Sequence, residues 1–347
     1  MENTSAFSSL YHSPSPFNIT LGIMYLLNTV VGIVGNFLVV FIVYKNKNMH
    51  TTTNYLLSNL AAADFMSLIF CPIPLAVDLS NNHIGGRTGQ FICKVFTGGF
   101  LSQLAKSVAF SSIILLAAER YHAIVTPFDT RFKLRKDNVG LAIGIIWATA
   151  VVICGPFVIW SEFDEKSKRC LDPWAIKKAS SMKPYITTVV VTFVCAACIL
   201  FYCYAQILRG IYITKTVCSE NVAVTDQTQL VAKKKLAVMS VSVTVSFCIC
   251  YAPSVLFQQF LAFENTEEVI LNYKTLYVVH SVVRFILYLG SSLNLLFYAF
   301  QSSSYRENLK RIIKRSATVV VIAVNEIEMA NGRRQAGAFP VINSSLK

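Results

Sequence analysis

Long apolar stretches separated by short polar connections dominate the pattern of this chain. About 20 apolar residues cross a bilayer as a helix, and seven stretches reach that length. They do not alternate residue by residue as barrel strands do. The seven predicted spans are Leu21 to Tyr44, Tyr55 to Leu79, Val95 to Val125, Val139 to Trp160, Tyr185 to Ile207, Leu236 to Phe263 and Leu276 to Phe300. The pattern predicts an all-α membrane protein, a seven-transmembrane helix bundle.

A short amphipathic helix is predicted after the seventh span. Its apolar residues recur at helical spacing: Tyr305, Leu309, Ile312 and Ile313. Lysine and arginine occupy the other face, which is typical of a helix lying on the inner leaflet among membrane lipids. The predicted organisation is 1–20 as an extracellular segment, 21–300 as the bundle, 301–315 as the membrane-surface helix and 316–347 as a cytoplasmic tail.

Composition and charge agree with a membrane protein and predict its orientation. The chain is 54% hydrophobic and only 14% charged, whereas a soluble domain carries about a quarter charged residues. Most of the net charge of +13 lies in the connections 1–2, 3–4 and 5–6 and in the tail. The segment before the first span has no Lys or Arg, which predicts an extracellular N-terminus. We expect a multi-pass plasma-membrane protein with no nucleic-acid partner.

Features of the predicted outer side fit this orientation. The polar N-terminus lacks the apolar run of a cleavable signal, so the first span is expected to act as its own insertion signal. Asn3 and Asn18 begin glycosylation sequons. Cys93 and Cys170 are the two cysteines on the predicted outer side. In an oxidising compartment they are predicted to form a disulfide that pins the loop between spans 4 and 5 over the bundle mouth.

Charged residues inside the spans point to function, because burying them in lipid is costly. Glu119 and Arg120 lie at the cytoplasmic end of the third span and can pair locally when the bundle is closed. Opening would release Arg120 towards the interior. The foot of span 6 carries the lysines 233–235, which cannot form an ion pair with Arg120, so only the local restraint by Glu119 is expected.

An ordered set of motifs, each on its own span, resembles the rhodopsin-like (class A) G-protein-coupled receptors, in particular neuropeptide receptors. The set comprises Gly35, Asn36, Asn59, Asp64, Cys93, Glu119, Arg120, Tyr121, Trp147, Pro156, Cys170, Tyr204, Phe247, Cys250, Pro253, Asn294 and Tyr298. The resemblance implies a non-enzymatic receptor for an extracellular ligand that activates heterotrimeric G proteins.

Two groups of residues receive roles from this resemblance. The implied activation switch comprises Glu119, Arg120, Tyr121, Tyr204, Phe247, Pro253, Asn294 and Tyr298. The implied site for a structural sodium ion, with no other cofactor expected, comprises Asp64, Asn36, Ser291 and Asn294. The alternative to the ion is a neutral Asp64 bonded to the asparagines.

The chain also departs from the family pattern. Tyr251 replaces a tryptophan, and Leu295 replaces the proline after Asn294. Ala109 and Gly290 stand where relatives often carry polar partners of the sodium site. The spacing from Cys93 to Arg120 is slightly longer than usual, which leaves the register at the top of span 3 open.

The upper bundle indicates the ligand class. Ser102 stands where amine receptors carry aspartate, and Tyr288 where opsins carry lysine, so neither class fits. The candidate ligand-binding residues are Ser102, Gln103, Lys106, Tyr251, Gln258, Gln259, His280, Arg284 and Tyr288. Lys106 and Arg284 need an acid, either Asp78 or a ligand carboxylate. A peptide ligand is predicted, and a lipid or small carboxylate is the alternative.

Two other classes of membrane protein fit the sequence less well. A transporter would show an inverted repeat or paired broken helices, and neither is evident. An intramembrane hydrolase would need convergent histidines and acids at one depth, and the predicted spans contain only His122, near the end of the third, and His280 in the seventh.

Overall fold

The computed structural model describes most of the bundle and only a short part of the tail. The chain divides into two units, Met1–Ser302 and Ser303–Lys347. The described residues are 16–73, 85–126, 128–129, 134–165, 169–171, 179–212, 224–264, 266–302, 305–312 and 314.

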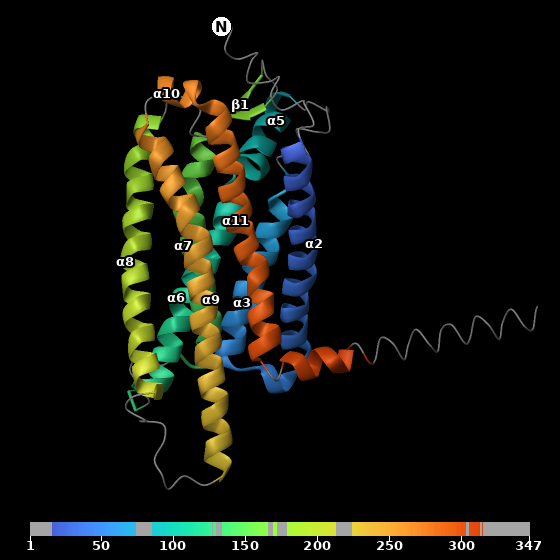
Figure 1. The fold of residues 1–347 in the computed structure, drawn as a ribbon, viewed down its shortest axis with the longest axis vertical. Helices are drawn as coiled ribbons and strands as arrows, with labels where there is room; N and C mark the ends of the chain where they lie inside the picture. The colour runs from blue at the N-terminus through green and yellow to red at the C-terminus, as the bar shows by residue number, and fades with distance from the viewer. Residues whose placement is uncertain are drawn as a thin grey trace, which may run out of the picture. The chain divides into compact units, whose positions relative to one another are not determined.

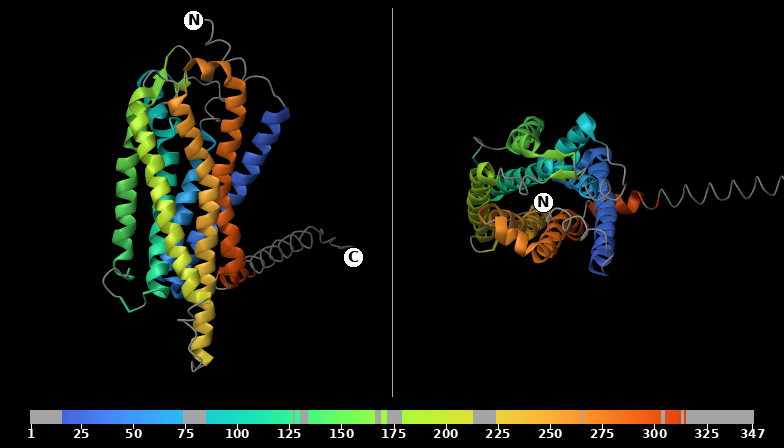
Figure 2. Two further views of the ribbon diagram at one scale, coloured as in Figure 1. Left: turned by 60° about the vertical axis from the view of Figure 1, so that its left-hand side comes forward. Right: turned by 90° about the horizontal axis from the view of Figure 1, so that it is seen from above.

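Long helices running side by side build the first unit (Figure 1). These helices are α2 (Pro16–Lys45), α3 (Thr52–Phe70), α6 (Phe100–Ile124), α7 (Val139–Trp160), α8 (Ala179–Tyr212), α9 (Val224–Phe263) and α11 (Tyr273–Gln301). Seen along the bundle, they surround a shared interior (Figure 2). The shorter elements are η1 (Lys47–Met49), α5 (Gly86–Ile92), the π-helix η2 (Cys93–Thr97), α10 (Thr266–Leu271) and the strands β1 (Glu162–Asp164) and β2 (Arg169–Leu171). The predicted all-α fold is confirmed.

The distribution of side chains is that of a multi-pass membrane protein. Six described helices are long and apolar enough to cross a bilayer. Large apolar side chains such as Leu26, Val152 and Phe201 cover the outside, while Asn36, Asp64 and other polar side chains are buried inside. Water is absent around such a bundle, so polar groups must find partners within the protein.

The helix α3 is not among those six, although it has 19 residues. It packs against α2, α6, α7 and α11, so neighbouring helices enclose it. Ten of its residues are buried, including Asn59 and Asp64. A helix enclosed by protein needs less apolar surface than one facing lipid, which explains its polar composition.

Several helix boundaries differ from the prediction. The fourth span coincides with α7, whereas α8 and α9 extend further towards the cytoplasmic side than predicted. The second span was predicted to reach Leu79, but α3 ends at Phe70, and residues 74–84 lie outside the described part. The helix α9 continues through Pro253. Proline lacks a backbone N–H, so one backbone hydrogen bond of the helix is lost, but the helix does not end there.

The third span was predicted as one helix from Val95 and is interrupted instead. The π-helix η2 is followed by Gly98 and Gly99, and α6 begins only at Phe100. Gly99 has φ 87°, a left-handed conformation that favours glycine. The wider π turn and this break accommodate the long spacing from Cys93 to Arg120.

A small hairpin covers the outer end of the bundle. The strands β1 and β2 pair antiparallel with Phe163 opposite Cys170. The predicted disulfide joins Cys93 to Cys170 with a Cα–Cα distance of 5.2 Å. The Phe163 amide donates to Gln90 Oε1 at 2.9 Å, which adds a second tie between the hairpin and α5.

Two predictions concern the ends of the chain. In the second unit, residues 305–312 form a helix as predicted, and residue 313 lies outside the described part. Asn3 also lies outside it, and the backbone of Asn18 belongs to α2. Glycosylation of both asparagines stays a prediction.

We expect Gly98→Ala to destabilise the bundle. A Cβ at this position would lie 2.7 Å from the Cys93 carbonyl oxygen and would overlap the Ser161 side chain. Such overpacking costs about 1–3 kcal/mol, so the melting temperature of the purified protein should fall. The control is Gly144→Ala in α7, where a Cβ meets nothing within 4 Å. Equal melting temperatures of the two variants would contradict the predicted close contact.

Candidate functional site

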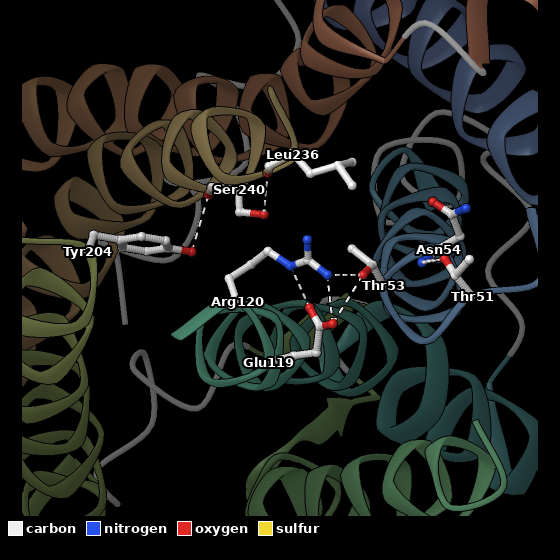
Figure 3. A network of polar contacts seen from close by, with 8 residues as sticks. All are labelled: Thr51, Thr53, Asn54, Glu119, Arg120, Tyr204, Leu236 and Ser240. Atoms are coloured by element: carbon white, nitrogen blue, oxygen red, sulfur yellow. Dashed lines mark hydrogen bonds and ion pairs between the residues drawn. The ribbon is translucent and has the colours of Figure 1, made fainter. Parts of the chain in front are cut away.

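The C-terminal end of α6 carries the pair that the sequence singled out. Arg120 Nε donates to Glu119 Oε2 at 2.5 Å, and Arg120 Nη2 donates to Glu119 Oε1 at 2.6 Å. Arg120 Nη2 also donates to the Thr53 hydroxyl, which itself donates to Glu119 Oε1 at 3.2 Å. Arg120 as a whole is 6% exposed, so Glu119 and Thr53 hold a buried charge between two helices (Figure 3).

Thr53 was not predicted from the sequence. It lies in the first turn of α3, where Thr51 caps the helix by accepting from the Asn54 amide at 3.3 Å. Asn54 Nδ2 donates to the Met49 carbonyl at 2.9 Å and fixes the entry into this turn. The contact of Thr53 with Arg120 depends on how α3 and α6 pack, which the sequence alone does not show.

Tyr204 of the predicted switch faces α9 rather than Arg120. Its hydroxyl bonds to Thr244 Oγ1 at 2.8 Å and donates to the Ser240 carbonyl at 3.3 Å (Figure 3). Tyr298 is buried in α11, and the Tyr121 ring lies edge-on to His122. In this arrangement Glu119 and Thr53 hold the Arg120 guanidinium, and the switch role of Tyr204 and Tyr298 stays a prediction.

An aromatic cluster joins three helices midway along the bundle. Phe247 and Tyr251 of α9 stack with ring centroids 5.1 Å apart. Phe110 of α6 stacks on both, at 5.9 Å and 6.2 Å, and Phe193 of α8 lies 5.3 Å from Tyr251. The sequence predicted the pair on α9. It did not predict Phe110 and Phe193, because the sequence of a membrane helix does not show which other helix each apolar residue contacts.

The four predicted sodium ligands converge in the interior. Asn294 Nδ2 donates to Asp64 Oδ2 at 2.7 Å. Asn36 Nδ2 donates to the carbonyl oxygens of Gly32 and Ser291 at 2.9 Å and 3.0 Å. These contacts bring α2, α3 and α11 together around a single buried carboxyl group.

Lys106 enters the same region from α6. Its ammonium donates to Ser291 Oγ at 2.5 Å and to the Leu287 carbonyl at 3.3 Å, and lies 5.1 Å from the centre of the Tyr288 ring. We call this group of buried side chains the polar core: Asn36, Asp64, Lys106, Ser291 and Asn294. Asp78, one predicted partner of Lys106, lies outside the described residues.

This arrangement does not fit a sodium ion on the predicted ligands. The protein's own ammonium already takes the Ser291 hydroxyl. Ala109 offers no ligand oxygen, and a Cβ at Gly290 would lie only 2.8 Å from Cys250 Cβ, which leaves little room for a polar side chain.

A second buried polar contact ties three helices together. Asn59 Nδ2 of α3 donates to Ser112 Oγ of α6 at 2.8 Å, and Trp147 Nε1 of α7 donates to Asn59 Oδ1 at 2.9 Å. Asn59 and Trp147 belong to the motif set, and Ser112 was missed. The Asn59 amide is satisfied on both sides, as a buried amide requires.

The remaining candidate ligand-binding residues lie nearer the outer end of α6, α9 and α11. Tyr288 interacts with Ser102 and Arg284. The His280 ring stacks on Phe257, with centroids 5.8 Å apart.

The candidate glutamines on α9 differ in their partners. Gln258 Nε2 donates to Ser254 Oγ at 3.3 Å, whereas the buried Gln259 Oε1 accepts no hydrogen bond from the described residues. Gln103 of α6 is half-buried. The binding role of all these residues stays a prediction.

Known proteins with similar sequences support the same family. The chain is 25% identical over 293 residues to the pyroglutamylated RF-amide peptide receptor of Mus musculus, covering 79% of this chain and 65% of that receptor. It is 26% identical over 313 residues to a QRFP-like peptide receptor of Branchiostoma floridae, covering 87% and 79%. It is 37% identical over 153 residues to neuropeptide FF receptor 1 of Homo sapiens, covering 44% and 34%.

The chain also matches a known family over most of the bundle. Residues 35–298 match the family described as "7 transmembrane receptor (rhodopsin family)". That range contains the Arg120 site, the aromatic cluster and the polar core. The chain therefore belongs to the rhodopsin family of seven-transmembrane receptors.

Proposed function

We propose that this chain is a plasma-membrane receptor that binds an extracellular peptide and activates heterotrimeric G proteins. Its N-terminus lies outside the cell and its cytoplasmic end meets the G protein. The observation that carries the proposal is the buried Arg120, which Glu119 and Thr53 hold at the cytoplasmic end of α6. A buried cation restrained at the mouth of a bundle fits a conformational switch.

The proposed mechanism is a shift between a closed and an open bundle. In the closed state Arg120 is bonded to α3 through Thr53, and Tyr204 is bonded to α9. The helix α9 contains Pro253. Outward movement of the part of α9 that precedes Pro253 would separate Tyr204 from Thr244 and expose Arg120. A ligand shifts this equilibrium only as far as it binds the open state better than the closed one.

The aromatic cluster links the proposed ligand side to this movement. Tyr251 is both a candidate ligand residue and a stacking partner of Phe247. Phe110 and Phe193 hold these rings from α6 and α8. A ligand that displaces the Tyr251 ring would change the contacts of Phe247 one helical turn further in, towards the cytoplasm.

A peptide is the ligand class that these observations favour. The relatives are receptors for an RF-amide peptide, a QRFP-like peptide and neuropeptide FF by their names. The candidate residues mix amides, an imidazole and cations, which suits the backbone and side chains of a peptide. Glu264 is half-buried and Glu268 exposed near the outer end of α9, where they would meet a basic peptide residue.

We expect Arg120→Ala to abolish G-protein activation without lowering the amount of protein at the cell surface. The released guanidinium is the group that the open state presents to the G protein, and alanine cannot replace it. The measurement is G-protein activation in cells, first without ligand and then with a peptide library, at matched surface levels.

The matched control for this variant is Arg87→Ala, which removes the same charge from an exposed position on α5 at the other end of the bundle. It should signal like the wild type. Signalling by Arg120→Ala at the wild-type level would refute the role given to Arg120. If lipids or small carboxylates activate the wild type and no peptide does, the peptide assignment is wrong.

We expect Thr53→Val to raise ligand-free signalling. Valine keeps the shape of the side chain but removes the hydrogen bonds to Arg120 and Glu119. Their loss should destabilise the closed state by about 1 kcal/mol, which corresponds to roughly a fivefold shift of the equilibrium towards the open state. The control is Thr149→Val, because the Thr149 hydroxyl bonds only to α7 carbonyl oxygens, at 2.9 Å and 3.0 Å. Unchanged or lower basal signalling in Thr53→Val would show that Thr53 does not restrain Arg120.

A further inference from the structure

The polar core contains a cation that belongs to the protein. Lys106 is 3% exposed and Asp64 is 2% exposed, so neither charge has access to water from outside the bundle. A buried charge without a partner is strongly unfavourable, which means that each needs the other or an equivalent ion.

The contacts connect these two charges through one side chain. The Lys106 ammonium donates to Ser291 Oγ at 2.5 Å, and the Ser291 side chain also interacts with the Asp64 carboxylate. Because the Ser291 oxygen accepts from Lys106, its proton is available to donate towards Asp64. Lys106 and Asp64 also attract each other directly across the core.

The sum of charges in the polar core decides whether a free ion fits. With Asp64 ionised and Lys106 protonated, the core is neutral. A sodium ion would add a second positive charge beside the ammonium, in an interior where like charges repel strongly. The ion would also have to displace the ammonium from Ser291, one of its expected ligands.

The remaining acceptors of the core suit neutral donors. Asn36 Oδ1 and Asn294 Oδ1 are buried and accept no hydrogen bond from the described residues. Water molecules can donate to both oxygens without changing the charge of the core. These two acceptors therefore do not require a metal ion.

We propose that Lys106 is a tethered cation that takes the place of sodium at Asp64, so that the closed state of this receptor does not respond to sodium. The lysine comes from α6, whereas its partners come from α3 and α11. The cation therefore ties three helices together at all sodium concentrations, while a free ion would do so only when bound. This property does not depend on G-protein activation or on the identity of the ligand.

The test is the melting temperature of the purified, ligand-free receptor in sodium chloride and in choline chloride of equal ionic strength. The wild type should melt at the same temperature in both salts. In choline chloride, Lys106→Met should melt at a lower temperature than the wild type, because methionine keeps the length of the side chain without its charge. Sodium should raise its melting temperature by several degrees, because an ion that binds only the folded state stabilises it.

The double variant Lys106→Met with Asp64→Asn is the matched control. It lacks both charges and should lose the response to sodium, which would locate the ion at Asp64. A wild-type receptor that is stabilised by sodium would overturn the proposal, and this comparison needs no variant to fold. The proposal would also be overturned if Lys106→Met folds and melts at the same temperature in both salts, because Asp64 would then need no cation.

Discussion

The structure depends on the burial of polar groups in a bundle whose outside offers them no partner. Lipid cannot satisfy an amide, a carboxylate or an ammonium, so each must be bonded within the protein. Asn59, Asp64, Asn294 and Lys106 are all buried and all bonded to side chains or carbonyl oxygens of other helices. These contacts, rather than apolar packing alone, fix which helices lie next to one another.

The helix α6 is the centre of this arrangement. At successive levels it bonds or stacks with its neighbours: Lys106 with α11, Phe110 with α8 and α9, and both Ser112 and Arg120 with α3. Lys106 and Arg120 are about four turns apart on one rigid helix. In the proposed mechanism, ligand binding near Lys106 and Phe110 would reach Arg120 through these contacts.

The outer end of α6 is fixed by different means. The disulfide from Cys93 to Cys170 and the bond from Phe163 to Gln90 tie the hairpin to α5 and η2. The break at Gly98 and Gly99 lets this part follow the hairpin while α6 keeps its own register. The chain therefore accommodates an unusual spacing without moving Lys106 or Arg120 relative to each other.

The sequence by itself determined the all-α membrane fold, the seven long helices by apolar length, the disulfide and the pairing of Glu119 with Arg120. These features rest on local hydrophobicity, on chain topology and on neighbours in sequence. Only the tertiary structure decided that Thr53 holds Arg120, that Phe110 and Phe193 complete the aromatic cluster, and that Lys106 turns inwards to Ser291. The direction of a long side chain and the level at which two helices meet are set by packing, and the sequence of one helix does not contain them.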